Sequence, residues 1–260
     1  MMKSLSSGPY YFLAGSPWPL SCSVSVLNML LGVYLLLKGI TKWFLFAGPI
    51  LLILNALMWF RDVHRESLNG DQGLYEQETM KSGMVLFILS EGFFFLSLFW
   101  GFFYIFISPE GSWPPSGVHA VDPLGIPLLG TIILMGSSVS ATMALHFVSL
   151  SNMKFAKLYL MLTVLSGAVF FVLQLEEFLS SSFTMADGAF GSLFYILTGF
   201  HGLHVVLGTI MLLYTLWRMA LFPGEMGKSY SYSMEVVVWY WHFVDVVWLF
   251  LYVSIYWGSW

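Results

Sequence analysis

Charged residues are scarce in this sequence of 260 residues. Asp, Glu, Lys and Arg make up 9% of the chain, with 10 basic and 14 acidic residues, whereas soluble domains contain about 25%. So few charges cannot cover the surface of a globular domain, and a hydrophobic share of 58% is too high for a disordered chain. The composition therefore excludes both a soluble enzyme and a disordered protein.

The sequence also has little cysteine and no net positive charge, and both shortages exclude further classes of protein. Cys22 is the single cysteine, so the chain has no internal disulfide and no cysteine-based zinc or redox motif. The formal net charge of -4 leaves no basic face for nucleic acid, whose binding needs clustered Lys and Arg. Aromatic residues, by contrast, reach 18%, and Trp and Tyr favour the boundary between hydrocarbon and headgroups. This combination is typical of a polytopic helical membrane protein.

Long segments without Lys or Arg predict the membrane spans. A hydrocarbon core of about 30 Å needs about 20 apolar residues of helix. The runs are apolar on every face, which favours helices over the alternating strands of a barrel. Seven segments qualify: Pro17–Leu37, Trp43–Phe60, Gly83–Ile107, Leu124–Leu150, Leu158–Leu175, Phe190–Trp217 and Val236–Trp257. The predicted fold class is all-α, a polytopic membrane protein with seven transmembrane helices.

The connectors predict orientation and organisation. With these spans, only Lys38 and Lys42 fall on the side opposite the N-terminus. The N-terminal side holds the other cations, Lys3, Arg61, Arg65, Lys81, Lys154, Lys157, Arg218 and Lys228. Because matrix-side or cytoplasmic loops retain Lys and Arg, we expect the N-terminus there. We expect an N-terminal segment at 1–16, a two-helix bundle at 17–60, a charged connector at 61–82 and a five-helix bundle at 83–260.

Glu91 is the most informative polar position, because it lies well inside the third predicted span, between Ser90 and Gly92. An ionised carboxylate in the middle of a bilayer costs about 2.5 kcal/mol or more. We therefore expect Glu91 to face protein, headgroup or water, or to be protonated. Two interpretations remain open: a protonated carboxyl that is hydrogen-bonded to a neighbouring helix, and a proton-linked role.

The last predicted span contains two further polar residues. His242 and Asp245 are three residues apart, so they share a helix face and are expected to form a hydrogen-bonded pair. A mutually satisfied pair in a packing network is the favoured interpretation, and proton transport is the alternative.

A similar spacing occurs in the sixth predicted span. His201 and His204 share a helix face, and His146 is the main further candidate for a metal or haem site. The interleaved Gly199 and Gly202 instead favour close helix packing with hydrogen bonds from the histidines. No metal site is expected, and a structural polar network is the role assigned to His201, His204, His242 and Asp245.

The end of the second predicted span suggests a lipid site. Arg61 and Arg65 lie one helical turn apart, near Trp59, and make a fork suited to a lipid phosphate. Glu66 is suited to accept from an ethanolamine headgroup, and Arg218 is a second cationic candidate. Ordinary positive-inside anchoring is the alternative for these cations.

Several ordered motifs together resemble one known family. They are Ser16–Leu20, Trp59–Ser67, Gly83–Glu91, Trp113–His119, Pro127–Leu129, Asp187–Gly188, Thr198–His204 and Trp239–Gly258. Over nearly the whole chain, they resemble subunit III of haem-copper cytochrome c oxidase.

The resemblance implies the first two helices splayed from the other five around a V-shaped cleft filled by phospholipids. It implies a multi-pass protein of the mitochondrial inner membrane, with its N-terminus in the matrix, that contacts subunits I and II and accessory subunits. It implies structural phospholipids but no haem or copper in this chain. Roles in stabilising the catalytic core, in proton uptake and in lipid-lined oxygen access are suggested.

The resemblance also assigns residues. Glu91 aligns with the family's intramembrane carboxyl, and Trp59, Arg65, Glu66 and Arg218 match positions associated with cleft lipids. Two departures stand out: Lys81 replaces a common Arg, and the connector from Leu68 to Met80 is acidic. A haem-bearing redox subunit and a stand-alone proton-coupled transporter that uses Glu91 and Asp245 are the alternative functions.

Overall fold

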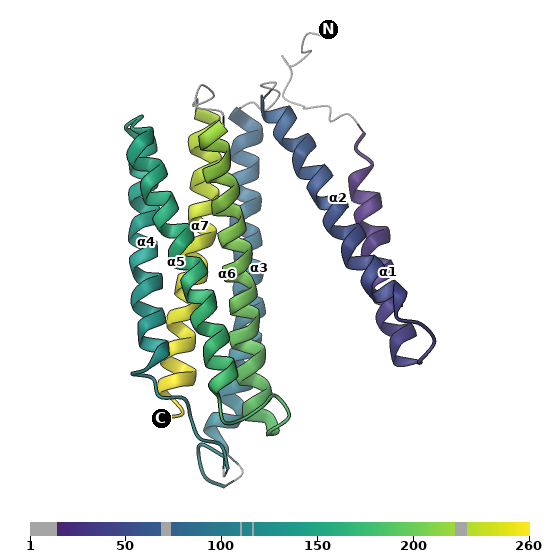
Figure 1. The fold of residues 1–260 in the computed structure, drawn as a ribbon, viewed down its shortest axis with the longest axis vertical. Helices are drawn as coiled ribbons and strands as arrows, with labels where there is room; N and C mark the ends of the chain where they lie inside the picture. Colours follow the sequence, from purple (N-terminus) through teal and green to yellow (C-terminus); the bar gives the residue numbers. More distant parts are fainter. Residues whose placement is uncertain (1–14, 69–73, 110, 116, 222–227) are drawn as a thin grey trace. The chain divides into compact units, whose positions relative to one another are not determined.

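The computed structural model describes residues 15–68, 74–109, 111–115, 117–221 and 228–260, and these residues contain helices and connecting turns but no strand (Figure 1). The helices are α1 (Trp18–Leu37), α2 (Trp43–Leu68), α3 (Leu74–Ile107), α4 (Ile126–Ser149), α5 (Met153–Ser180), α6 (Gly188–Leu221) and α7 (Lys228–Leu251), and α7 continues as a π-helix, η1 (Tyr252–Trp257). Seven helices within the described ranges are long and apolar enough to cross a membrane, so the predicted fold class is confirmed.

Most helices extend beyond the apolar runs that predicted them. α2 continues past Phe60 to Leu68, and α3 begins at Leu74, before the predicted start at Gly83. The length of an apolar run is set by the thickness of the hydrocarbon, whereas the backbone hydrogen bonds of a helix can continue into the headgroup layer. A helix can therefore be longer than its apolar run. Residues 1–14 of the predicted N-terminal segment and residues 69–73 of the predicted connector lie outside the described residues.

The chain divides into two compact units, Met1–Glu78 and Thr79–Trp260. In the first unit, α1 and α2 form a hairpin whose backbones approach closely at two glycines. A Cβ atom on Gly32 would lie 2.6 Å from the Leu45 nitrogen, and one on Gly48 would lie 2.7 Å from Met29 Cα. Only glycine permits this approach, which brings the two helices into direct backbone contact.

Polar side chains fix the register of the same hairpin. Asn55 Nδ2 donates to Ser25 Oγ at 2.8 Å, and Trp18 Nε1 donates to Asp62 Oδ2 at 2.9 Å. Because hydrogen bonds are directional and lipid offers few competing partners, these contacts select one alignment of α1 against α2.

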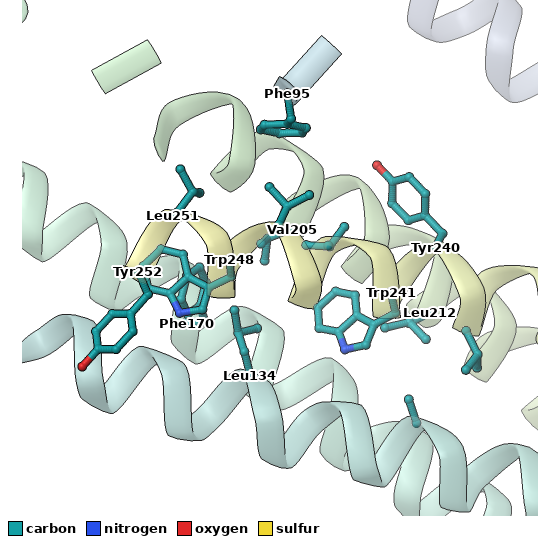
Figure 2. Packing of buried hydrophobic residues seen from close by; sticks show 14 of the residues in the cluster. Phe95, Leu134, Phe170, Val205, Leu212, Tyr240, Trp241, Trp248, Leu251 and Tyr252 are labelled. Carbon is teal, nitrogen blue, oxygen red and sulfur yellow. The ribbon is translucent and has the colours of Figure 1, made fainter. Parts of the chain in front are cut away.

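The second unit has a core of large side chains around α7. Trp241 and Trp248 of α7 are 0% and 1% exposed. Figure 2 shows both indoles on the side of α7 where Leu134 of α4 lies. The glycines that admit Trp241 are Gly167 and Gly208, where a Cβ atom would lie 2.7 Å and 2.8 Å from the indole.

Close packing at Gly199 and Gly202, which the sequence suggested, is absent: a Cβ atom on either would meet nothing within 4 Å. The spacing of Gly199 and Gly202 identified a face of α6 with small residues, but it did not identify the glycines beside which a side chain of another helix packs. The side chain that does fill such a space, Trp241, belongs to a distant part of the sequence.

The serine-rich segment of α4 forms a packing surface for α5 and α7. Ser137 Oγ accepts from Trp241 Nε1 at 3.0 Å, and Ser140 Oγ lies 2.8 Å from Thr163 Oγ1 of α5. Farther along, Thr131 Oγ1 accepts from Trp248 Nε1 at 2.9 Å. Hydroxyls of α4 therefore bind both buried indoles of α7.

Aromatic rings attach α3 to the rest of the second unit. Phe94 packs edge-on against Phe200 of α6 with 5.0 Å between ring centroids, and Phe95 meets Phe243 of α7 at 6.3 Å. An ion pair also connects α3 to α7, because Lys81 Nζ lies 2.8 Å from Glu235 Oε2. These long side chains hold α3 beside α6 and α7 without close approach of the backbones.

Candidate functional site

The intramembrane carboxyl of Glu91 has a specific partner. Glu91 lies on α3 and His204 on α6, and Glu91 Oε2 is 3.1 Å from His204 Nε2. The side chain of Glu91 is 25% exposed, whereas that of His204 is 8% exposed. The carboxyl therefore lies at the edge of the helix bundle and the imidazole lies inside it. The contact with His204 agrees with one of the two interpretations left open for Glu91, a carboxyl that is hydrogen-bonded to a neighbouring helix.

The imidazole of His204 is held in one orientation. Its Nδ1 lies 2.7 Å from the carbonyl oxygen of Phe200, one turn earlier on α6. Its ring packs edge-on against Phe95, with centroids 5.0 Å apart, and stacks on Tyr240 at 6.4 Å. α3, α6 and α7 thus each supply one wall, and Nε2 is directed at Glu91.

His201 has a different environment, although it lies on the same face of α6. It is fully buried, and its two ring nitrogens have no hydrogen-bond partner. Its ring meets Phe170 and Trp248, with centroid distances of 5.7 Å and 5.2 Å. The expectation that histidine hydrogen bonds bridge the helices is therefore right for His204 and wrong for His201.

The predicted pair of His242 and Asp245 does not form. His242 Nδ1 lies 2.6 Å from Ser138 Oγ and its Nε2 lies 3.2 Å from Thr142 Oγ1. Asp245 is 3% exposed, and neither of its carboxyl oxygens has a hydrogen-bond partner. The hydroxyls of α4 satisfy the imidazole across the helix contact, so it does not turn along its own helix to Asp245.

The four polar residues assigned to one network therefore are not joined to one another by hydrogen bonds. Within the described ranges, no group of three or more His, Cys, Asp and Glu side chains is placed to hold a metal ion. His146, the further candidate ligand, lies beside Phe147 with 6.0 Å between ring centroids.

The cationic lipid candidates differ in exposure. Arg61 is largely exposed, and its guanidinium makes a 2.9 Å ion pair with Asp62. Arg65 is exposed, Glu66 is half-buried and Trp59 is 38% exposed. Arg218 is 9% exposed, so the chain itself covers most of its side chain. Of these cations, Arg61 and Arg65 are exposed and Arg218 is buried.

A second buried carboxyl, Glu177, was missed from the sequence. It is 2% exposed, and its Oε1 accepts from Tyr256 at 2.5 Å and from Gln174 at 3.2 Å. The predicted fifth span ended at Leu175 and left Glu177 in a connector, whereas α5 continues to Ser180. The three-residue spacing of Gln174 and Glu177 was the available signal, since it places two polar groups on one helix face.

In the part of the chain that the structure describes, seven helices long and apolar enough to cross a membrane define a multi-pass membrane protein, and the polar pair of Glu91 and His204 lies between two of them. Comparison with known families gives the particular one: a family model described as Cytochrome c oxidase subunit III matches residues 8–260. The chain belongs to the cytochrome c oxidase subunit III family.

Curated relatives agree with this assignment. The chain is 44% identical over 260 residues to Cytochrome c oxidase subunit 3 of Tachyglossus aculeatus aculeatus, with 95% of this chain and 96% of the relative covered. It is 43% identical over 253 residues to the protein of that name from Danio rerio, with 95% and 96% covered. The protein of that name from Scyliorhinus canicula is 41% identical over 254 residues, with 96% and 97% covered.

Proposed function

We propose that this chain is a non-catalytic core subunit of cytochrome c oxidase in the mitochondrial inner membrane. It contacts subunits I and II and accessory subunits, stabilises the catalytic core, and has its N-terminus in the matrix. The observation that carries the proposal is the family match over residues 8–260. In this proposal, haem and copper belong to the partner subunits.

Glu91 is the residue through which the subunit supports proton uptake. Its carboxyl is partly exposed at the edge of the bundle and contacts a single buried imidazole, that of His204. A carboxyl in this position can accept a proton from outside the bundle while its partner stays shielded.

Phospholipids bind along the apolar outer surface of the helices, where their acyl chains provide a path for oxygen. Large hydrophobic side chains are exposed on that surface, among them Trp100 at 76% and Leu179 at 88%. Arg65 and Arg61, with Trp59 and Glu66 nearby on α2, bind the headgroup of one such lipid, and Arg218 on α6 provides a separate cation for a headgroup beside the second unit.

Purification of the complex tests the assignment. We expect the chain to co-purify with a haem-containing oxidase core, and haem and copper to stay with that core when detergent removes the chain. Recovery of the isolated chain with stoichiometric haem or copper would contradict the proposal and favour the redox-subunit alternative. Substrate-dependent proton flux in vesicles that contain this chain alone would favour a transporter.

A lipid analysis tests the cationic residues separately. We expect the complex that carries the double substitution Arg65→Ala and Arg218→Ala to retain less phospholipid than the unaltered complex. Lys38→Ala is the control, since it removes a cation on the opposite side of the membrane. Unchanged lipid content in the double variant would leave both arginines as topology anchors.

A further inference from the structure

We propose that His204 is the proton partner of Glu91, so that the two side chains together bind one proton inside the membrane. The ligand of the site is a proton, and its two binding groups lie on different helices, α3 and α6. The inference rests on the proposed function only in giving this proton a use, because its test measures protonation and not oxidase turnover.

The hydrogen bonds of His204 fix the number of protons that the pair holds. Its Nδ1 lies 2.7 Å from the Phe200 carbonyl oxygen, which can only accept, so Nδ1 carries a hydrogen. Its Nε2 lies 3.1 Å from Glu91 Oε2, and a hydrogen bond there needs one hydrogen between the two atoms. Either a neutral His204 accepts from a protonated Glu91, or a charged His204 donates to an ionised Glu91. Both arrangements contain the same single shared proton and have no net charge.

Any other number of protons leaves an unpaired charge. A second proton would place a charged imidazole beside a neutral carboxyl that cannot balance it. Loss of the shared proton would leave an ionised carboxylate facing the lone pair of Nε2. An isolated charge within a membrane-spanning bundle is costly, so the pair with one proton is its most stable form.

The neighbouring ionisable groups favour the same state. His201 precedes His204 by one turn of α6 and is enclosed by Phe170 and Trp248. Tyr240 of α7 stacks on the imidazole of His204, and a phenol is neutral at physiological pH. Because Glu91 is more exposed than His204, a proton that arrives from outside the bundle reaches the carboxyl first.

Infrared spectroscopy of the whole oxidase complex tests the inference. The difference between the unaltered complex and a Glu91→Gln complex isolates the carboxyl absorption of Glu91. We expect exchange of H2O for D2O to shift this absorption, because the carboxyl takes part in a hydrogen bond that contains an exchangeable hydrogen. An absorption that is the same in H2O and D2O would overturn the proposal, and this measurement does not require a histidine variant to assemble.

The second measurement replaces the partner. In a His204→Gln complex of equal haem content, we expect the Glu91 absorption to shift and hydrophobic carbodiimide to label Glu91 faster, because the carboxyl no longer shares its proton. His146→Gln is the matched control, since this histidine lies on α4 beside Phe147 and should leave both readouts unchanged. An unaltered absorption and labelling rate in His204→Gln would overturn the proposal. Unchanged proton uptake by a His204→Gln complex whose Glu91 absorption has shifted would instead refute only the proposed use of the proton.

Discussion

Replacement of Gly208 by alanine should destabilise the second unit, because Trp241 fills the space beside this glycine. A Cβ atom at position 208 would lie 2.8 Å from Trp241 Cε3 and 3.1 Å from Cζ3. The indole has little room to move away. On another edge, a Cβ atom at Gly167 would lie 2.7 Å from its Cη2, and its Nε1 donates to Ser137 Oγ at 3.0 Å.

The magnitude follows from a matched control on the same helix. Gly199→Ala adds the same methyl group to α6, where a Cβ atom would meet nothing within 4 Å. Alanine is favoured over glycine in a helix by about 1 kcal/mol, and this contribution cancels when the two variants are compared. Overpacking of a filled core costs about 1–3 kcal/mol. We therefore expect the free energy of unfolding of Gly208→Ala to be about 1–3 kcal/mol below that of Gly199→Ala.

Unfolding in mixed micelles of a mild detergent and sodium dodecyl sulfate, followed by circular dichroism, measures this difference. Both variants carry an alanine in the middle of α6, so a general effect of the substitution on the helix would appear in both. If the two unfold within about 0.5 kcal/mol of each other, the space beside Gly208 is not filled by a fixed indole and the reasoning is refuted.

Two further substitutions test polar contacts by the same assay. Tyr256→Phe removes a donor from the buried carboxyl of Glu177 and should lower the free energy of unfolding by about 1–3 kcal/mol. Tyr104→Phe is the control, because its side chain is 74% exposed and its loss of a hydroxyl should not lower that free energy. Equal effects of the two substitutions would contradict the buried contact. Lys81→Met breaks the partly exposed ion pair with Glu235 and should cost less than about 1 kcal/mol, and a larger loss would show that the pair is shielded from solvent.

The fold was predictable because a bilayer imposes one strong rule on the sequence. Each helix must supply an apolar run long enough to cross the hydrocarbon, so runs without Lys or Arg locate the spans. The requirement for an apolar run does not determine where a helix ends outside the hydrocarbon. The prediction therefore ended the fifth span at Leu175, whereas α5 extends to Ser180 and brings Glu177 into the helix.

Partners across helices were not predictable in the same way. Glu91 was identified from its cost in lipid, but its partner lies 113 residues away and no local pattern connects them. His242 and Asp245 were paired because they share a helix face, yet hydroxyls on α4 bind the imidazole instead. Periodicity gives the face on which a side chain lies, whereas its contact depends on which helix covers that face.

The contact between α4 and α7 shows why such partners matter in lipid. Apolar side chains gain little by leaving lipid for protein, so apolarity alone does not align two membrane helices. Here Trp241, His242 and Trp248 of α7 each bond to a hydroxyl of α4. Rotation of α7 by one residue would break all of these bonds and leave the donors without partners in a medium that offers none. A small number of serine and threonine hydroxyls therefore fixes the rotation of α7, which in turn fixes where Tyr240 stacks on His204 beside Glu91.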